Sequence, residues 1–150
     1  GIGGTKACQV MAAIEFARRF LVHETLLVKN YKDILPYIED LRWKKQEYFV
    51  TITLDGGHHL IERRVVAVGT LNESLIHPRE IFVDAISDRA GAIIFAHNHT
   101  SSDVTPSQND FKITNRLVEV GELVGIEVLD HVIINKEEEF SFRDNGLVGD

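Results

Sequence analysis

Four residues in one short segment carry side chains that could bind a metal ion and use it. His97 and His99 stand in the pattern H-x-H, and after seven residues Ser107 and Asp110 stand in the pattern S-x-x-D. Two imidazoles and a carboxylate suit a four-coordinate zinc ion, one per chain, whose fourth position stays open to water. Zinc makes water a nucleophile near neutral pH, so an open zinc site usually indicates hydrolysis. The pattern predicts His97, His99 and Asp110 as metal ligands.

The segment before the first histidine determines where the two imidazoles point. Residues 91–96 form a continuous apolar run of strand length, which is typical of a strand buried on both faces. Side chains alternate along a strand, so His97 and His99 would project from one face and Asn98 from the other. Two imidazoles on one face at the end of a buried strand can share one metal ion.

The residues after the loop read as the start of a helix. Thr105 is the expected N-cap, Pro106 suits the first helical position, and Gln108 stands where a capping-box partner belongs. Ser107 and Asp110 are three residues apart on this opening turn, so they would share a face. One helical turn could therefore offer a carboxylate to the metal and a hydroxyl beside it.

The remaining periodicity predicts a mixed sheet with helices, an α/β or α+β fold with the metal at a strand end. The expected helices cover Thr5–Phe20, Lys32–Arg42, Pro78–Arg89 and Pro106–Val124. The expected strands cover Glu47–Leu54, Leu60–Val68, Ala92–Ala96, Glu127–Asn135 and Phe140–Arg143. A turn at Gly56-Gly57 would join the first two strands as an antiparallel pair. The third helix would bury one apolar face, formed by Ile81, Phe82, Ala85 and Ile86.

The segment from His97 to Asp110 resembles the JAMM motif of the MPN/JAB-domain metalloproteases, and specifically their RadC branch. Other stretches are similar to RadC proteins in order and spacing: Val68–Ser74, His77–Phe82, Thr105–Ser107, Asp130–Ile134 and Phe140–Arg143. The resemblance runs from about residue 32 to the end. RadC proteins usually carry proline and glycine after the second histidine, where this chain has Thr100 and Ser102. Neither position is a proposed ligand, so the difference concerns the loop and its substrate contacts.

The resemblance implies both a fold and an activity. Residues 31–150 would form a JAB/MPN-type metal domain, a mixed sheet flanked by helices that is similar to the cytidine deaminase fold. The activity would be that of a zinc-dependent peptidase or isopeptidase that cuts an amide bond in a peptide or protein conjugate. The family also carries a DNA-repair label, which nothing in these residues explains.

The resemblance further implies a glutamate that accepts a proton from the activated water and passes it to the leaving amine. Glu47 is the candidate, because it opens a stretch that alternates polar and apolar residues as a half-buried strand does. Its rivals are Glu62, on the next strand, and Glu80, on the following helix. Ser107 would help to stabilise the oxyanion that develops on the substrate.

His131 allows two interpretations. It lies in an apolar strand next to Asp130, either as a buried histidine with a satisfied hydrogen bond or as a residue that orients a metal ligand. We favour the structural interpretation. The adjacent letters His97-Asn98-His99 do not indicate an HNH nuclease, whose three residues are spread along a longer motif. A nucleobase deaminase needs a Pro-Cys-x-x-Cys pair, and the only cysteine here is Cys8.

The first residues raise the question of DNA. Gly1–Ala7 resembles the second half of a helix-hairpin-helix, in which backbone N–H groups at a helix N-terminus bind a DNA phosphate. RadC proteins typically carry such a module before the metal domain. We therefore expect residues 1–30 to be a remnant of that module and a linker. The first helix of the pair is missing, so no DNA binding is expected from these residues alone.

Composition limits the class of protein. The 150 residues include 23 acidic and 16 basic side chains, a net charge of −7, which argues against a broad nucleic-acid-binding face. One cysteine excludes an internal disulfide and fits a reducing cytoplasm. No apolar stretch approaches membrane-spanning length, so no membrane partner is expected. The chain reads as one cytoplasmic domain with a single core.

Two alternatives stay open. The protein could be a DNA-associated repair or recombination accessory protein whose metal site is not catalytic. The metal could also be iron or manganese, because two histidines and an aspartate accept these ions too.

Overall fold

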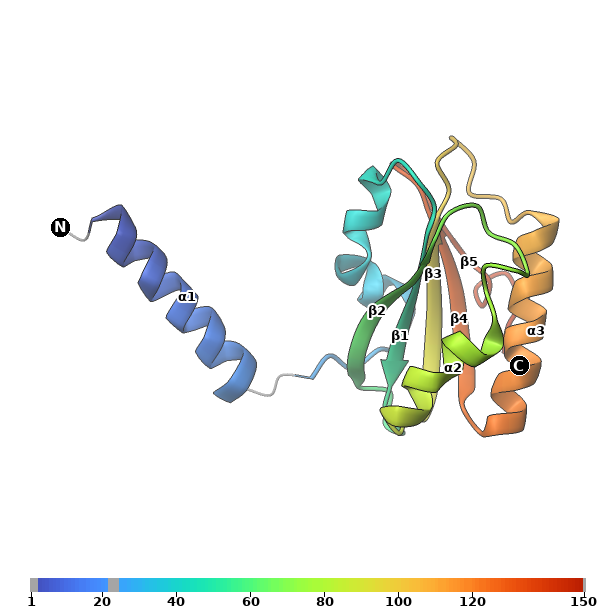
Figure 1. The fold of residues 1–150 in the computed structure, drawn as a ribbon, viewed down its shortest axis with the longest axis horizontal. Helices are drawn as coiled ribbons and strands as arrows, with labels where there is room; N and C mark the ends of the chain where they lie inside the picture. Colours follow the sequence, from blue (N-terminus) through green and yellow to red (C-terminus); the bar gives the residue numbers. More distant parts are fainter. Residues whose placement is uncertain (1–2, 22–24, 150) are drawn as a thin grey trace.

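The sheet of this chain is mixed and five-stranded. In the computed structural model, which describes residues 3–21 and 25–149, the strands run in the order β2-β1-β3-β4-β5 (Figure 1). They are β1 (Tyr48–Leu54), β2 (Leu60–Val68), β3 (Ala92–Asn98), β4 (Glu127–Ile134) and β5 (Glu139–Ser141). Neighbouring strands pair antiparallel except β3 and β4, which are parallel. The predicted mixed sheet flanked by helices is confirmed.

The largest difference from the predicted helices lies in the segment before β1. The α-helices are α1 (Gly4–Leu21), α2 (Pro78–Ser87) and α3 (Gln108–Val124). The single helix expected around residues 32–42 is two short 3₁₀ helices, η1 (Tyr31–Tyr37) and η2 (Glu39–Trp43). Pro36 lies inside η1 and has no N–H to donate, and Ile38 between the two segments adopts a φ of −126°. A continuous α-helix is therefore interrupted here.

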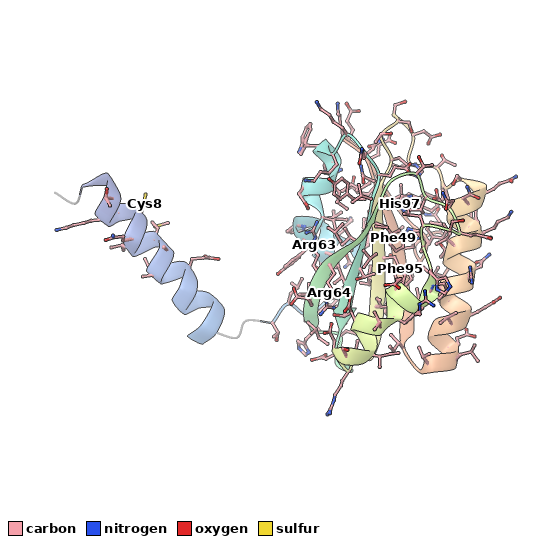
Figure 2. The ribbon with its side chains drawn as sticks, viewed as in Figure 1. Cys8, Phe49, Arg63, Arg64, Phe95 and His97 are labelled. Carbon is pink, nitrogen blue, oxygen red and sulfur yellow. The ribbon has the colours of Figure 1, made fainter. Side chains whose placement is uncertain are left out.

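The central strands β1, β3 and β4 are buried on both faces, whereas the edge strand β2 is partly exposed. One face packs against α2 and α3, and the other packs against η1 and η2 (Figure 1). The alternation along β3 follows this division, because Ile93 and Phe95 belong to the first core and Ile94 and Ala96 to the second. His97 continues the series of Phe95, so its side chain lies on the face that α3 covers (Figure 2).

The start of α3 corrects one prediction. The N-cap is Ser107 and not Thr105, and the capping-box partner is Asp110 and not Gln108. The hydroxyl oxygen of Ser107 accepts a hydrogen bond from the Asp110 N–H at 3.1 Å, and the Asp110 carboxylate accepts one from the Ser107 N–H at 2.7 Å. This reciprocal pair satisfies two N–H groups at the helix start, so it defines the first turn better than Thr105 could.

Helix α1 is drawn apart from the sheet, beyond residues 22–24 (Figure 1). Its Cys8 is exposed (Figure 2). The prediction of half a helix-hairpin-helix falls partly on Gly1 and Ile2, which lie outside the described residues, so the motif stays a prediction. Within residues 3–21 and 25–149, no helix combines the length and the apolar character that crossing a membrane requires.

Gly121 is the position where α3 comes closest to the segment that leads into β4. A Cβ added there would stand 2.5 Å from the carbonyl oxygen of Ile126 and 3.1 Å from Cγ2 of Val128. We expect Gly121→Ala to lower the free energy of unfolding by about 1–3 kcal/mol, because overpacking outweighs the better helix propensity of alanine. Urea denaturation measures the change, with the exposed neighbour Glu122→Ala as the control. A Gly121→Ala protein as stable as the wild type would show that α3 can shift freely.

Candidate metal centre

The end of β3 and the first turn of α3 bring the three predicted ligands together. One ligand atom each from His97, His99 and Asp110 lies within 4.8 Å of the others. Nε2 of His97 stands 3.3 Å from Oδ1 of Asp110, and Nε2 of His99 stands 3.0 Å from Oδ2. Ligands on a tetrahedral ion with bonds of about 2 Å are roughly 3.3 Å apart. The cluster could therefore hold a metal ion with little rearrangement.

The backbone orients the ring of His99. Its Nδ1 lies 2.9 Å from the carbonyl oxygen of Asp103, which can only accept, so Nδ1 carries a proton. In the neutral ring, Nε2 then presents a lone pair to the carboxylate of Asp110 at 3.0 Å. Two acceptors this close need a cation or a proton between them. Hydrogen bonding of the far ring nitrogen to a backbone carbonyl is the usual arrangement for a metal-binding histidine.

His97 supplies an independent test of whether a metal fits. Its side chain is fully buried, and so is that of Asp110. Among the residues that the structure describes, Nε2 of His97 is one of the few buried polar atoms without a hydrogen-bond partner. A buried polar atom left unpaired is costly, and such groups in native proteins call for a physical explanation. A metal ion between His97 and Asp110 would satisfy this nitrogen.

Charge in the cluster favours a cation. Burial opposes ionisation of Asp110, but the imidazoles of His97 and His99 hold the pKa of its carboxyl well below the usual range. Burial likewise opposes protonation of His99, but the Asp110 carboxylate and the Asp103 carbonyl raise the pKa of its imidazole. The carboxylate thus stays ionised, and a positive charge beside it is stabilised, whether carried by a proton or by a metal.

A polar cleft of about 430 Å³ opens onto this cluster. Glu47 and Ser107 line it together with His99 and Asp110, so the structure places both proposed catalytic side chains beside the ligands. Oε2 of Glu47 accepts a hydrogen bond from the Leu71 N–H at 3.0 Å. The oxygen of Ser107 accepts from the Asp110 N–H, which leaves its own proton free to be donated.

The rivals of Glu47 lie elsewhere. Glu62, on β2, and Glu80, in the first turn of α2, are both exposed, and neither lines this cleft. Proximity therefore favours Glu47 among the three candidate proton acceptors.

Asn98 is a residue of the site that sequence reasoning left without a role. It points to the opposite face from His97, as the alternation predicted. Its amide N–H donates to the carbonyl of Gln46 at 2.9 Å, and its amide oxygen accepts from the N–H of Tyr48 at 2.7 Å. These two bonds flank Glu47 and fix the backbone on both sides of it. An asparagine between two histidines that are proposed metal ligands was the sequence signal for this function.

His131 is a second neighbour of the cluster. Its Nε2 lies 2.7 Å from Nδ1 of His97, and its ring stacks on Phe142 with centroids 4.9 Å apart. Burial is the main reason that the pKa of His131 lies far below the usual value for an imidazole. His131 is therefore a buried and hydrogen-bonded core residue, which is the interpretation that we favoured, and it also contacts the proposed ligand His97.

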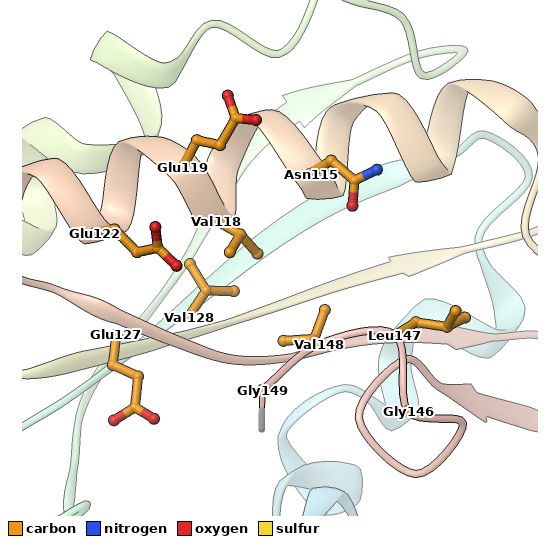
Figure 3. A pocket seen from close by; sticks show the side chains of 10 residues that line it. All are labelled: Asn115, Val118, Glu119, Glu122, Glu127, Val128, Gly146, Leu147, Val148 and Gly149. Atoms are coloured by element: carbon orange, nitrogen blue, oxygen red, sulfur yellow. The ribbon is translucent and has the colours of Figure 1, made fainter.

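Two further pockets are distinct in character. Thr100 and Ser102, the positions where the loop departs from RadC proteins, line a cleft of about 280 Å³ together with Lys44 and Lys136, and His99 and Thr100 line both this cleft and the one at the cluster. A pocket of about 520 Å³ lies between α3, β4 and the C-terminal segment (Figure 3). None of its ten lining residues is a histidine or cysteine, so the chemistry described above belongs to the cluster at the strand end.

Comparison with known proteins agrees with this geometry. The family model described as RadC-like JAB domain matches residues 28–147. Three UPF0758 proteins match 99% of this chain. The protein of Geobacillus kaustophilus is 43% identical to this chain, that of Bacillus cereus 42%, and that of Clostridium tetani 40%. The match covers 67%, 68% and 67% of those proteins, respectively. The fold, the histidine and aspartate cluster and these matches together show that the chain belongs to the RadC family and carries its JAB domain.

Proposed function

We propose that this chain is a zinc-dependent hydrolase of JAMM type that cuts an amide bond, as a peptidase or an isopeptidase. The observation that carries the proposal is a cluster of two histidines and one aspartate that opens onto a cleft containing a glutamate and a serine. Three protein ligands with an open side are the arrangement of catalytic rather than structural zinc sites. Membership of the RadC family supports the same reading.

Each side chain then has a defined task. When bound, zinc would lower the pKa of water and polarise the substrate carbonyl. His97, His99 and Asp110 would hold it, with Nε2 of each imidazole and the carboxylate as donors. Glu47 would take a proton on its carboxylate and deliver it to the leaving amine. The free hydroxyl proton of Ser107 would be donated to the oxyanion that develops on the substrate.

DNA binding, which is not expected from residues 1–30 alone, stays a separate proposal. Gly1 and Ile2 lie outside the described residues, and the net charge of −7 offers little general attraction to phosphate. No contact in the described residues favours the accessory role over hydrolysis.

The metal content of the purified protein is the first prediction. Wild-type protein is expected to contain about one zinc per chain, and His97→Ala/His99→Ala to contain none, since a single remaining carboxylate cannot hold the ion. Elemental mass spectrometry gives the ratio. The matched control is His58→Asn/His59→Asn, which also removes two histidines and keeps a residue type that tolerates the left-handed φ of 64° at position 58. Wild-type protein without zinc, even after zinc is added at neutral pH, would exclude the proposed function.

The role of Glu47 is tested by Glu47→Gln. This variant is expected to keep its zinc and its bond from the Leu71 N–H, and to lose roughly 10²- to 10⁴-fold in turnover, because the amide cannot accept the proton. The assay is release of fluorescence from quenched peptides that contain either ordinary peptide bonds or lysine ε-amide bonds. Glu62→Gln and Glu80→Gln should both retain wild-type turnover. If a zinc-loaded wild type cleaves neither bond type, or Glu47→Gln remains fully active, the assignment is wrong.

Ser107 has two roles that different substitutions separate. Ser107→Ala should destabilise the protein by about 1 kcal/mol through loss of the N-cap, whereas Ser107→Gly should cost only a few tenths. Both lack the hydroxyl donor, so both should lower kcat by about 10²- to 10³-fold if the hydroxyl stabilises the oxyanion. Denaturation and kinetics are measured on the same samples. Wild-type turnover in Ser107→Gly would restrict Ser107 to the structural role.

A further inference from the structure

A buried chain of hydrogen bonds leads from His97 into α3, and the proposed mechanism does not use it. Nδ1 of His97 lies 2.7 Å from Nε2 of His131, and Nδ1 of His131 lies 2.6 Å from the hydroxyl oxygen of Thr114. That hydroxyl in turn lies 2.6 Å from the backbone carbonyl of Asp110. The side chains of all four residues are buried, and Thr114 and His131 are completely so. The chain of bonds therefore begins and ends at proposed metal ligands.

The carbonyl group of Asp110, at the end of this chain of hydrogen bonds, determines which atom donates in each bond. The carbonyl oxygen of Asp110 can only accept, so the Thr114 hydroxyl must donate its single proton to it. The hydroxyl oxygen then has only lone pairs to offer His131. Because two atoms 2.6 Å apart need a proton between them, Nδ1 of His131 carries that proton and donates it.

The same reasoning continues to His97. The ring of His131 packs among Phe49, Phe95 and Phe142, where an imidazolium would be a buried charge without a carboxylate partner. His131 is therefore the neutral tautomer with its proton on Nδ1, and its Nε2 is an acceptor. The proton in the 2.7 Å contact belongs to Nδ1 of His97. The remaining ring nitrogen of His97, Nε2, faces Asp110 and has no hydrogen-bond partner among the described residues.

We infer that Thr114 and His131 are positioning residues that keep a proton on Nδ1 of His97 and so present its Nε2 lone pair to the metal. The inference rests on the proposed function for the identity of the metal, but the arrangement of protons rests on the hydrogen bonds and on the apolar surroundings of His131. His99 is oriented by one backbone carbonyl, whereas His97 is oriented by a relay of two side chains. The relay also returns to Asp110, so one set of bonds fixes the tautomer of one ligand and the backbone of another.

Thr114→Val and Thr114→Ser form the matched pair that tests the relay. Valine keeps the shape of threonine but removes the hydroxyl, and serine keeps the hydroxyl. Loss of a group that orients a metal ligand typically weakens metal binding about 10- to 100-fold. We expect Thr114→Val to bind zinc about tenfold or more weakly, and Thr114→Ser to bind within about twofold of wild type. Competition with a chromogenic chelator measures the affinity, and thermal unfolding reports whether each variant is folded.

The tautomer itself is read from the metal-free protein. Long-range ¹H–¹⁵N correlation spectra of histidine-labelled protein should show His131 protonated on Nδ1 and unprotonated on Nε2 in the wild type and in Thr114→Ser, and a changed pattern in Thr114→Val. If Thr114→Val does not fold, His131→Phe takes its place. His131→Phe keeps an aromatic ring among Phe49, Phe95 and Phe142 but removes the nitrogen that accepts the proton of His97. This variant should also bind zinc more weakly.

The outcomes separate this inference from the proposed function. A wild type that binds no zinc overturns the function, and the spectra still decide the tautomer. A proton on Nε2 of wild-type His131 overturns the inference, as does Thr114→Val binding zinc like the wild type. Equal weakening in Thr114→Val and Thr114→Ser would likewise overturn it, since that result means a packing role.

Discussion

The carboxylate of Asp110 meets two requirements at once, and the arrangement of the site depends on it. One oxygen accepts the Ser107 N–H and also faces His99, while the other faces His97. The group that closes the first turn of α3 is therefore the group that joins the two imidazoles. The start of the helix cannot shift by a residue without moving the carboxylate away from both histidines. Helix capping and ligand geometry are one constraint here.

The parallel pairing of β3 and β4 places the start of α3 close to the two histidines. Two parallel strands need a crossover connection, and α3 is that connection, so it lies across the face onto which His97 projects. In the register of this pair, His131 on β4 stands beside Phe95 on β3, and Phe95 is two residues before His97. The imidazole of His131 thereby comes between His97 and the helix, where Thr114 meets it. The relay is a consequence of topology, because only a helix on this face can complete it.

The sequence was sufficient for the parts of the site that depend on local periodicity. Strand alternation predicted the common direction of His97 and His99, and the three-residue spacing predicted the shared face of Ser107 and Asp110. The N-cap was wrong by two residues, because Thr105 and Ser107 both carry capping side chains and only the reciprocal bond to Asp110 decides between them.

Contacts between segments far apart in the chain could not be predicted in the same way. Thr114 reads as an ordinary helical residue until the strand that carries His131 is placed against it. Ile86 was expected in the buried face of α2 but is 57% exposed, because the helix contacts the core over a narrower stripe than its apolar residues cover.

The position of Glu47 beside the proposed ligands depends on the same alternation of side chains that buries His97. A residue that follows a buried strand side chain must point to the other face, so Asn98 is directed away from α3 and toward the start of β1. There its amide bonds to both neighbours of Glu47, and β1 pairs with β3 so that Phe49 stands opposite His97. The tripeptide His97-Asn98-His99 thus supplies two proposed ligands on one face and anchors the proposed proton acceptor from the other. The proposed proton acceptor is thereby tied by hydrogen bonds to the strand that carries the two histidines proposed as ligands.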